Sequence, residues 1–124
     1  MSFLTKLQIN SVRNINNIEL NLDPCLNIIF GINGSGKTSI LESIHLLATG
    51  RSFRTPKTES IIAEASAELT IYAENEQQSR IGLSRGRNTK HKLKLDSKLQ
   101  RNWESVARAL PVQVVSANTF SLLE

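Results

Sequence analysis

The stretch that decides the fold runs from Leu26 to Gly50 and reads LNIIFGINGSGKTSILESIHLLATG. A short apolar run ends at Gly31, and the pattern G-x-x-x-x-G-K-T follows it directly. This pattern predicts a P-loop, the glycine-rich turn between a buried strand and a helix that binds nucleotide phosphates. The pattern and the residue after it are Gly31, Ile32, Asn33, Gly34, Ser35, Gly36, Lys37, Thr38 and Ser39.

Glycines in this loop allow backbone N–H groups to point into one concavity. The concavity opens onto the N-terminus of the next helix, where the partial positive charge favours an anion. Lys37 adds a full charge for the β- and γ-phosphates of ATP, and the Thr38 hydroxyl is placed to ligate Mg²⁺. The alternative is a glycine-rich turn with a surface lysine, which the filled motif and both flanks make much less favourable.

The residues after the loop repeat at helical spacing. We expect an apolar helix face made of Ile40, Leu41, Ile44, Leu47 and Ala48. Gly50 is suited to end this helix, because glycine adopts the left-handed conformation found just after helix C-termini. An apolar strand, a phosphate loop and an amphipathic helix in succession predict an α/β fold of the P-loop NTPase class.

The 124 residues allow one domain at most, and a hydrophobic share of 40% can fill a modest core. No stretch approaches the roughly 20 apolar residues of a membrane helix, and the N-terminus lacks a secretory signal pattern. Cys25 is the single cysteine, so we expect neither an internal disulfide nor a zinc site. These features indicate a cytoplasmic protein with no membrane partner.

The net charge is +4 and the pI is about 9.6. Much of the excess lies between residues 80 and 101, where Asp96 is the single acid. The basic residues of this stretch are Arg80, Arg85, Arg87, Lys90, Lys92, Lys94, Lys98 and Arg101. Such a patch fits a phosphate backbone and equally fits the solvated face of edge strands, where lysines oppose aggregation.

Alternation of apolar and polar residues predicts further strands. Residues 1–30 contain two of them, Leu4–Ile9 and 18–22, with Arg13–Asn14 and Asn16–Asn17 in the turn between, and the strand before the P-loop follows. Residues from about 66 to 96 read as an antiparallel meander. Its expected inward residues are Ala67, Leu69, Ile71, Ala73, Ile81, Leu83, Leu93 and Leu95, and its expected turns are 74–78 and 85–88. His91 is predicted to be a solvent-side strand residue, with no partner that would make it a catalyst or a ligand.

Two segments flank this meander. Arg51 and Arg54, in the loop after the P-loop helix, are either phosphate ligands or ordinary surface residues. After the meander, Asn102 is a candidate N-cap. The helix that it would start has an apolar stripe of Trp103, Val106, Ala107 and Leu110, it ends at Pro111, and Val112–Val115 read as a further strand.

A P-loop ATPase needs a second strand ending in an acid that supports Mg²⁺. No apolar run after residue 50 ends this way. The string Leu83-Ser84-Arg85-Gly86 matches part of an ABC-type signature, but no amphipathic helix follows it, so we read it as part of a hairpin. We therefore expect the N-terminal part of a longer protein, which binds phosphate but does not hydrolyse ATP alone.

Three segments together carry a resemblance to a known family. The opening LxIxxVRNI, the loop GINGSGKTSILESI and the GRSFRT behind its helix are similar to the bacterial RecF family, DNA replication and repair ATPases related to SMC proteins. The resemblance covers residues 1–124. It implies an ABC-type ATPase head, with a mixed sheet around the P-loop helix and an antiparallel sheet beside it.

The resemblance also implies ligands and partners. It implies ATP and Mg²⁺ as cofactors, ATP-dependent binding of single-stranded or gapped DNA, an ATP-dependent homodimer, and recombination mediator proteins as partners. It places Arg13 and Asn14 near the nucleotide, beside the P-loop residues. Where the family commonly has a Pro-acid pair, this chain has Ala117-Asn118, so Gln113 and Ser116 receive no role.

Three other functions remain open at this stage. One is another SMC-like ATPase of the overcoming-lysogenization nuclease type, which a downstream metal-binding domain would reveal. Another is a P-loop small-molecule kinase, which the meander opposes because such kinases alternate strand and helix. The last is DNA binding by the basic stretch without turnover.

Overall fold

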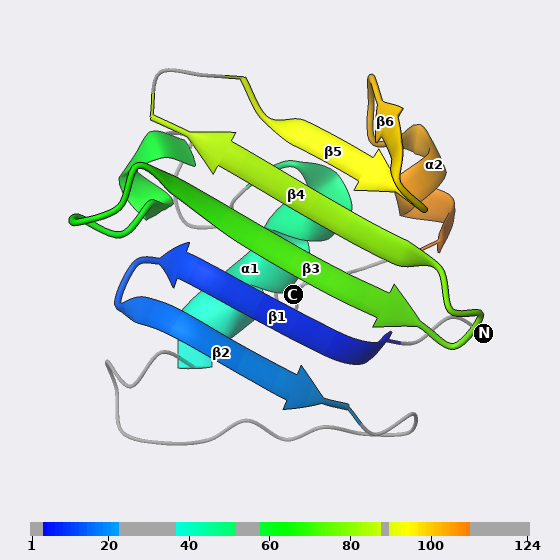
Figure 1. Ribbon diagram of the computed structural model, residues 1–124, viewed down its shortest axis with the longest axis horizontal. Coiled ribbons are helices and arrows are strands. Elements are labelled where there is room, and N and C mark those ends of the chain that lie inside the picture. The colour runs from blue at the N-terminus through cyan, green and yellow to red at the C-terminus, as the bar shows by residue number, and fades with distance from the viewer. Residues whose placement is uncertain (1–3, 23–36, 52–57, 88–89, 110–124) are drawn as a thin grey trace, which may run out of the picture.

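The computed structural model describes residues 4–22, 37–51, 58–87 and 90–109. Within them the chain forms a six-stranded antiparallel sheet in the order β2-β1-β3-β4-β5-β6, and the helix α1 (Lys37–Thr49) packs against one face (Figure 1). The strands are β1 (Leu4–Val12), β2 (Ile15–Asn21), β3 (Glu68–Asn75), β4 (Arg80–Gly86), β5 (Lys92–Leu95) and β6 (Lys98–Gln100). Two short helices, η1 (Thr58–Ile61) and α2 (Glu104–Ala109), complete the described fold.

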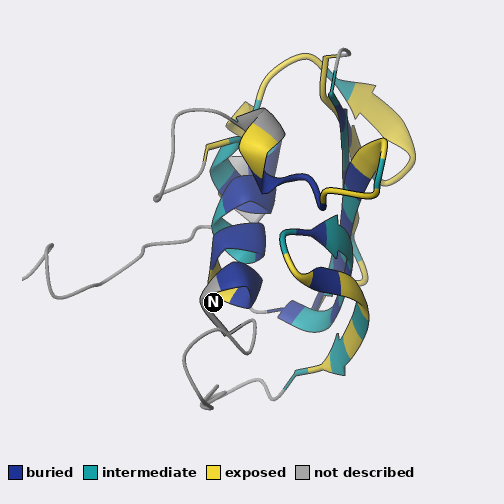
Figure 2. Cartoon of the chain, turned by 90° about the vertical axis from the view of Figure 1, so that its left-hand side faces the viewer, coloured by how far each residue is buried: buried dark blue, intermediate teal, exposed yellow. Residues whose placement is uncertain are grey.

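The core lies between the sheet and α1, as the buried residues in Figure 2 show. Successive side chains of a strand point to opposite faces. Residues that are paired directly across neighbouring strands therefore form a row on one face of the sheet. The row Ile18-Ile9-Ile71-Leu83-Leu93 crosses β2, β1, β3, β4 and β5 toward α1. Within it Ile9, Ile71 and Leu93 are almost fully buried. The predicted inward residues of the meander are therefore confirmed, except Ala67, which is exposed before β3 begins.

The predicted apolar face of α1 is correct in part. Ile40, Leu47 and Ala48 are buried, but the side chain of Leu41 is 49% exposed. The buried stripe is rotated relative to the prediction, and Glu42 and Ser43 lie fully inside it. The purely apolar pattern misplaced the face because two polar residues occupy core positions.

The turn between β1 and β2 is shorter than predicted. Asn16 and Asn17 belong to β2, where Asn17 pairs with Asn10. Arg13, within the connection, has a left-handed backbone with a φ of 51°. A two-residue connection lets the ladder continue next to the turn, so the polar Asn16–Asn17 pair did not end the strand.

The second half of the meander differs from the prediction in one strand boundary and in one additional strand. Arg85 and Gly86 still belong to β4 rather than to a turn, which also places the Leu83–Gly86 string in a strand. The strand β6 was not predicted. It pairs with β5 through a turn in which Asp96 and Ser97 have φ values of 52° and 70°, the geometry of a tight hairpin turn that glycine and asparagine usually occupy.

Beyond the sheet, Asn102 acts as the expected cap, since its Oδ1 accepts a hydrogen bond of 3.0 Å from the Glu104 N–H. Val106 on α2 is buried. The strand before the P-loop, the Val112–Val115 strand and hence the mixed part of the sheet lie outside the described residues and stay predictions. None of the helices in the described residues is long and apolar enough to cross a membrane.

Candidate nucleotide-binding site

The candidate site begins where α1 begins. The described part of the helix begins at Lys37, the last residue but one of the P-loop pattern, and its first turn contains no acidic residue. The N-terminal end of the helix therefore keeps its partial positive charge for an anion. Ser39 is buried in this first turn, and its carbonyl accepts a hydrogen bond of 2.8 Å from the Ser43 hydroxyl.

The other predicted phosphate ligands cannot be placed as fully. Lys37 and Thr38 lie in the first turn of α1, but the description stops at their backbone. Outside the described residues are Gly31, Ile32, Asn33, Gly34, Ser35 and Gly36. Their roles, and that of Thr38 toward Mg²⁺, stay predictions. The residues that can be placed fit a triphosphate, because α1 starts at Lys37 and presents no carboxylate in its first turn.

The structure brings Arg13 onto this helix. The Arg13 Nε donates to Glu42 Oε1 at 2.6 Å, and Nη2 donates to Oε2 at 3.2 Å. This is a bidentate ion pair in which the Glu42 side chain is fully buried and that of Arg13 is 27% exposed. The hydrogen bond to Glu42 raises the pKa of Arg13, although desolvation opposes the rise. The pair connects the β1–β2 turn to α1 within two turns of the helix start.

The backbone around Arg13 is also held in place. The Arg13 N–H donates to the Ile61 carbonyl at 2.7 Å, and the Ala63 N–H donates to the Ser11 carbonyl at 2.9 Å. Val12 and Ile62 form an antiparallel bridge between these two bonds. The β1–β2 turn is therefore fixed from both sides, by the segment after η1 and by α1, so the Arg13 guanidinium has a defined position near the P-loop helix.

Sequence reasoning placed Arg13 and Asn14 near the nucleotide through a family resemblance, and missed Glu42. A signal for Glu42 exists in the spacing of the helix. Ser39, Glu42, Ser43 and Leu46 recur at intervals of three and four residues, and all four are buried. A carboxylate within a buried helical stripe implies a cationic partner, and Arg13 is that partner.

The opposite end of α1 is closed by different chemistry. The Gly50 N–H donates to the Leu46 carbonyl at 2.8 Å with a φ of 77°, which confirms the predicted stop. The Trp103 indole N–H donates to the Leu47 carbonyl at 2.9 Å. His45 and Arg51 also meet here, with the His45 Nδ1 2.7 Å from the Arg51 carbonyl oxygen. Arg51 is exposed, and Arg54 lies outside the described residues.

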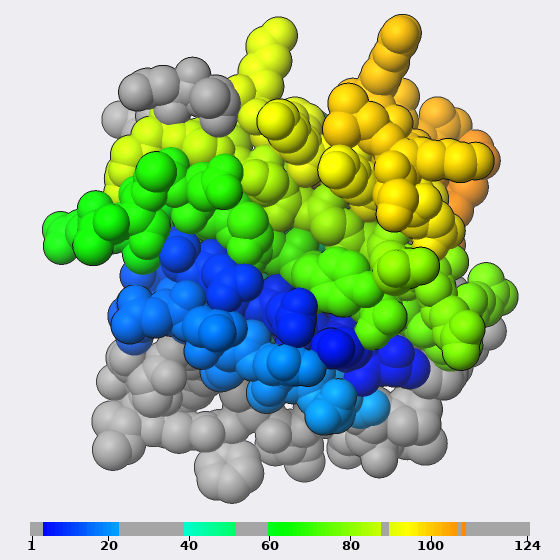
Figure 3. Space-filling view, viewed as in Figure 1, coloured from blue at the N-terminus to red at the C-terminus, as the bar shows by residue number. Residues whose placement is uncertain are grey.

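The basic stretch from Arg80 to Arg101 is not one uniform patch. Arg87 has a structural role, because its guanidinium donates to the carbonyls of Ser66 at 3.1 Å and Ala63 at 2.8 Å. Arg85 points inward and lines a small cavity with Trp103. The exposed cations are Arg80, Lys90, Lys92, Lys94, Lys98 and Arg101. Figure 3 shows the sheet face that α1 does not cover, to which β5 and β6 contribute one edge.

His91 is exposed, as predicted, and its ring also packs against Trp103. Its ring lies edge-on to Trp103, with ring centroids 4.5 Å apart, and it precedes β5 rather than belonging to it. Burial lowers the pKa of His91, and the nearby charges of Arg85 and Lys90 lower it further. The histidine contributes to packing at the C-terminal end of α1.

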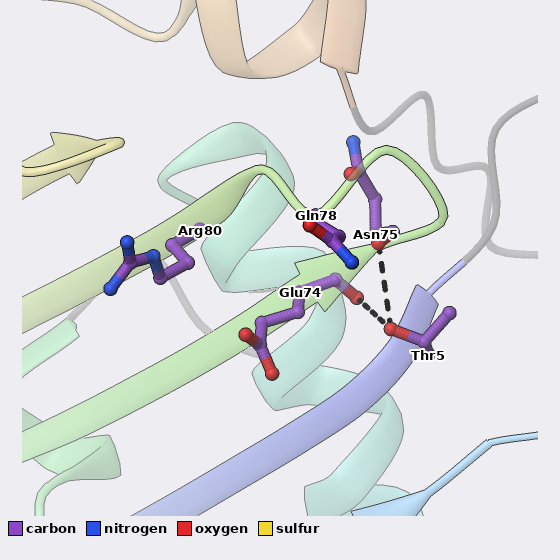
Figure 4. Close-up of a pocket in the computed structure, with 5 residues that line it drawn as sticks. All are labelled: Thr5, Glu74, Asn75, Gln78 and Arg80. Carbon is purple, nitrogen blue, oxygen red and sulfur yellow. Dashed lines mark hydrogen bonds between the residues drawn. The ribbon is translucent and has the colours of Figure 1, made fainter.

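A polar hollow of about 370 Å³ lies near the start of β1 and the turn between β3 and β4. Figure 4 shows its lining, in which the Thr5 hydroxyl donates to the Glu74 carbonyl at 3.3 Å. Asn75, Gln78 and Arg80 complete the lining. Thr5 is near the start of β1 whereas Arg13 follows the end of that strand, so this hollow is remote from the Arg13–Glu42 pair. Among the described residues no cluster of three acidic, histidine or cysteine side chains could hold a metal ion.

A helix that starts at a phosphate-loop lysine and packs on an antiparallel sheet defines a lobe of a P-loop NTPase head. The chain belongs to the RecF/RecN/SMC N-terminal domain family, whose model matches residues 3–122. A similar relative is the DNA replication and repair protein RecF of Shewanella loihica, 42% identical over 97% of this chain. The chain spans about a third of the length of that relative, 34%.

Solved structures show the same fold. A structure of the recombination mediator protein RecF with ATP superposes with a TM-score of 0.77 at 22% identity, covering 85% of this chain and 30% of that chain. An SMC ATPase from work on ATP-driven dimerisation and DNA-stimulated activation gives a TM-score of 0.79 at 17% identity, covering 98% and 90%. The predicted RecF resemblance and the partial head lobe are both confirmed.

Proposed function

We propose that this chain is the ATP-binding N-terminal portion of a RecF-type protein, which acts in DNA replication and recombinational repair in the cytoplasm. The observation that carries the proposal is that the described part of α1 begins with the P-loop lysine Lys37 and has no acid in its first turn, while Glu42 fixes Arg13 beside the helix. The RecF relative and the ATP-bound RecF neighbour support it.

In this proposal each residue has a simple task. Backbone N–H groups of residues 31–36 and Ser39 surround the phosphates, Lys37 neutralises the β- and γ-phosphates, and Thr38 ligates Mg²⁺. ATP bound here supplies the γ-phosphoryl group that a complete head would transfer to water. Arg13 and Asn14 lie toward the nucleotide, and the Arg13 donors that Glu42 leaves unused are available to it. We place the acid that completes hydrolysis outside this chain.

The proposal extends to partners. A head of this kind dimerises with ATP between its subunits, binds single-stranded or gapped DNA when ATP is bound, and meets recombination mediator proteins. The likeness to an SMC ATPase studied for ATP-driven dimerisation supports the first of these. A small-molecule kinase is disfavoured, because a sheet with five antiparallel strand pairings does not follow strand–helix alternation.

Calorimetric titration with Mg-ATP tests the nucleotide site. We expect binding by the full natural protein and its loss in Lys37→Ala, since the phosphates lose their charged partner. Lys98→Ala removes an exposed lysine on β6 and is the matched control, which should bind as the parent does. Equal ATP affinity in Lys37→Ala and the parent would contradict the proposed site.

A second measurement concerns the complete system. With Lys37→Ala in the full natural protein, ATP-dependent DNA binding should disappear, whereas the 124-residue chain alone should show no appreciable ATP turnover. Lys37-dependent hydrolysis by the chain alone would show that the missing acid is not required. Unchanged DNA affinity in the presence of ATP would refute the link between the two ligands.

A further inference from the structure

The sheet face that α1 leaves uncovered carries an unusual cross-strand row. Register places Gln8 opposite Tyr72, Tyr72 opposite Gly82, Gly82 opposite Lys94, and Lys94 opposite Leu99. A tyrosine and a lysine are thus separated by a residue without a side chain. A Cβ placed on Gly82 would meet no atom within 4 Å. The row therefore has a notch between an aromatic ring and a cation.

This notch is part of a hollow of about 420 Å³ on the open face. Its polar and aromatic lining residues are Glu68, Thr70, Tyr72, Ser84, Lys92 and Lys94. Neighbouring strands lie about 4.8 Å apart, so Tyr72 and Lys94, two strands apart, are roughly 10 Å from each other. The hollow is wide enough for a flat ring to lie beside Tyr72 while a charged group reaches β5.

The charges are distributed unevenly over this face. Lys92 and Lys94 are exposed on one side of the hollow. The acid at its end, Glu68, accepts a hydrogen bond of 3.2 Å from the Ser84 hydroxyl. On the far side of the face Lys6 and Glu19 form an ion pair of 3.2 Å and so offset each other. The unbalanced positive charge lies along β5.

Tyr72 is suited to stacking rather than to ionic contacts. Burial raises the pKa of Tyr72, and the neighbouring Glu74 carboxylate raises it further. The phenol is therefore neutral at physiological pH and adds no negative charge that would repel a phosphate. An aromatic side chain on a sheet face with lysines nearby is the arrangement that single-strand binding surfaces use.

We infer that the open face of β3, β4 and β5 binds single-stranded DNA, with one base stacked on Tyr72 over the Gly82 notch and the backbone passing Lys92 and Lys94. This inference rests on the proposed function, because it locates the DNA-binding activity on a particular surface. Lysines that served only to protect an edge strand would need neither an aromatic ring nor an open notch beside them.

The test is a fluorescence anisotropy titration of labelled oligodeoxythymidylate against the full natural protein with Mg-ATP. Tyr72→Ala removes the stacking surface and should weaken binding about tenfold, whereas Tyr72→Phe keeps the ring and should bind as the parent does. Gly82→Val fills the notch with a good strand former and should also weaken binding. The matched control Lys6→Gln, on the same face but outside the hollow, should leave affinity unchanged.

The salt dependence of the affinity distinguishes the contribution of the lysines from that of the Tyr72 ring. Each phosphate contact on a single strand contributes about 0.7 to the slope of log affinity against log salt. The double variant Lys92→Gln/Lys94→Gln should therefore lower this slope by about 1.4, and Tyr72→Ala should leave it unchanged. A duplex of equal length should be insensitive to Tyr72→Ala, because its bases are already stacked.

The possible failures are distinct. If the parent binds the oligonucleotide but Tyr72→Ala and Gly82→Val bind equally well, the assigned surface is wrong and the proposed function stands. An equal loss for the duplex would overturn base stacking as the mode of binding. If the parent binds Mg-ATP but no DNA, both the surface and the DNA-binding part of the proposed function are wrong.

Discussion

The two ends of α1 are held by opposite kinds of chemistry. Near its start a buried carboxylate, Glu42, binds the Arg13 guanidinium through two hydrogen bonds. At its end the helix turns at Gly50 against the Trp103 ring, whose indole N–H binds the Leu47 carbonyl. One end depends on a charge pair and the other on an aromatic ring and a glycine.

This difference fits the proposed function. A phosphate-binding helix end needs fixed positive groups, and a bidentate pair orients a guanidinium more strictly than apolar packing does. The proposed function assigns no ligand to the other end, where shape and one hydrogen bond hold the helix. Because the pair is charged and buried, we expect the N-terminal half of α1 to tolerate substitution least.

The largest expected effect follows from removing Arg13. Arg13→Met leaves the fully buried Glu42 carboxylate without this partner, and breaking a buried pair costs about 3–5 kcal/mol. Glu42→Met should cost less, because the Arg13 side chain is 27% exposed and can turn to water. Urea unfolding of both variants measures the free energies of unfolding.

The double variant Arg13→Met/Glu42→Met is the control for this pair. It removes both charges, so it should be more stable than Arg13→Met alone. If the free energy of unfolding lost in the double variant equals the sum of the losses in the two single variants, the ion pair does not couple the β1–β2 turn to α1. An equal loss of unfolding free energy in both single variants would contradict the explanation that the partly exposed Arg13 tolerates the loss of its partner better than the buried Glu42 does.

At the other end, Trp103→Ala should cost about 2–3 kcal/mol, below the roughly 3–5 kcal/mol of a fully buried ring because Trp103 is only half-buried. Trp103→Phe keeps most of the packing and loses the bond to the Leu47 carbonyl, for about 1 kcal/mol. Thermal or urea unfolding distinguishes the two. Similar losses in both variants would mean that the hydrogen bond, rather than the ring, supports this end.

Gly50→Ala should cost about 1–2 kcal/mol, because a Cβ is strained at a φ of 77°. The added Cβ would also lie 3.0 Å from the Trp103 ring. In a Trp103→Ala background the second cost disappears, so the two substitutions should combine to less than their sum. Gly82→Ala is the matched control, since its Cβ meets nothing and its stability should change by less than about 0.5 kcal/mol.

Much of the fold was predictable because period-two alternation is read directly from the chain. Leu69, Ile71, Ile81 and Leu83 point to the core as the pattern predicts. The β6 strand was missed because its turn uses Asp96 and Ser97 rather than glycine or asparagine. The pattern also could not show that β1 and β2 join the meander in one sheet, because strand pairing over long sequence distances has no local signal.

The candidate site was predictable at the motif and less so around it. The phosphate-loop spacing predicts a helix from about Lys37, and the separate tasks of its positions stay predictions. Glu42 escaped because a helix face was sought among apolar residues alone. Tyr72 and Lys94 could not be joined from the sequence, since their alignment across Gly82 depends on the register of three strands.

The smallest expected effect is a pH dependence at the Trp103 end. Burial lowers the pKa of His91 below 6.5 in the folded protein, so the unfolded chain binds the proton more readily. The stability contributed by neutral His91 is therefore complete above about pH 6.5 and is lost as the pH falls toward the folded pKa. Urea midpoints at about pH 7.5 and 5.5 should converge in His91→Phe, which keeps the ring contact with Trp103. A pH dependence as large in His91→Phe as in the parent would show that His91 is not its source. In that case the Trp103 end of α1 would contribute no pH dependence to the free energy of unfolding, just as a purely apolar contact contributes none.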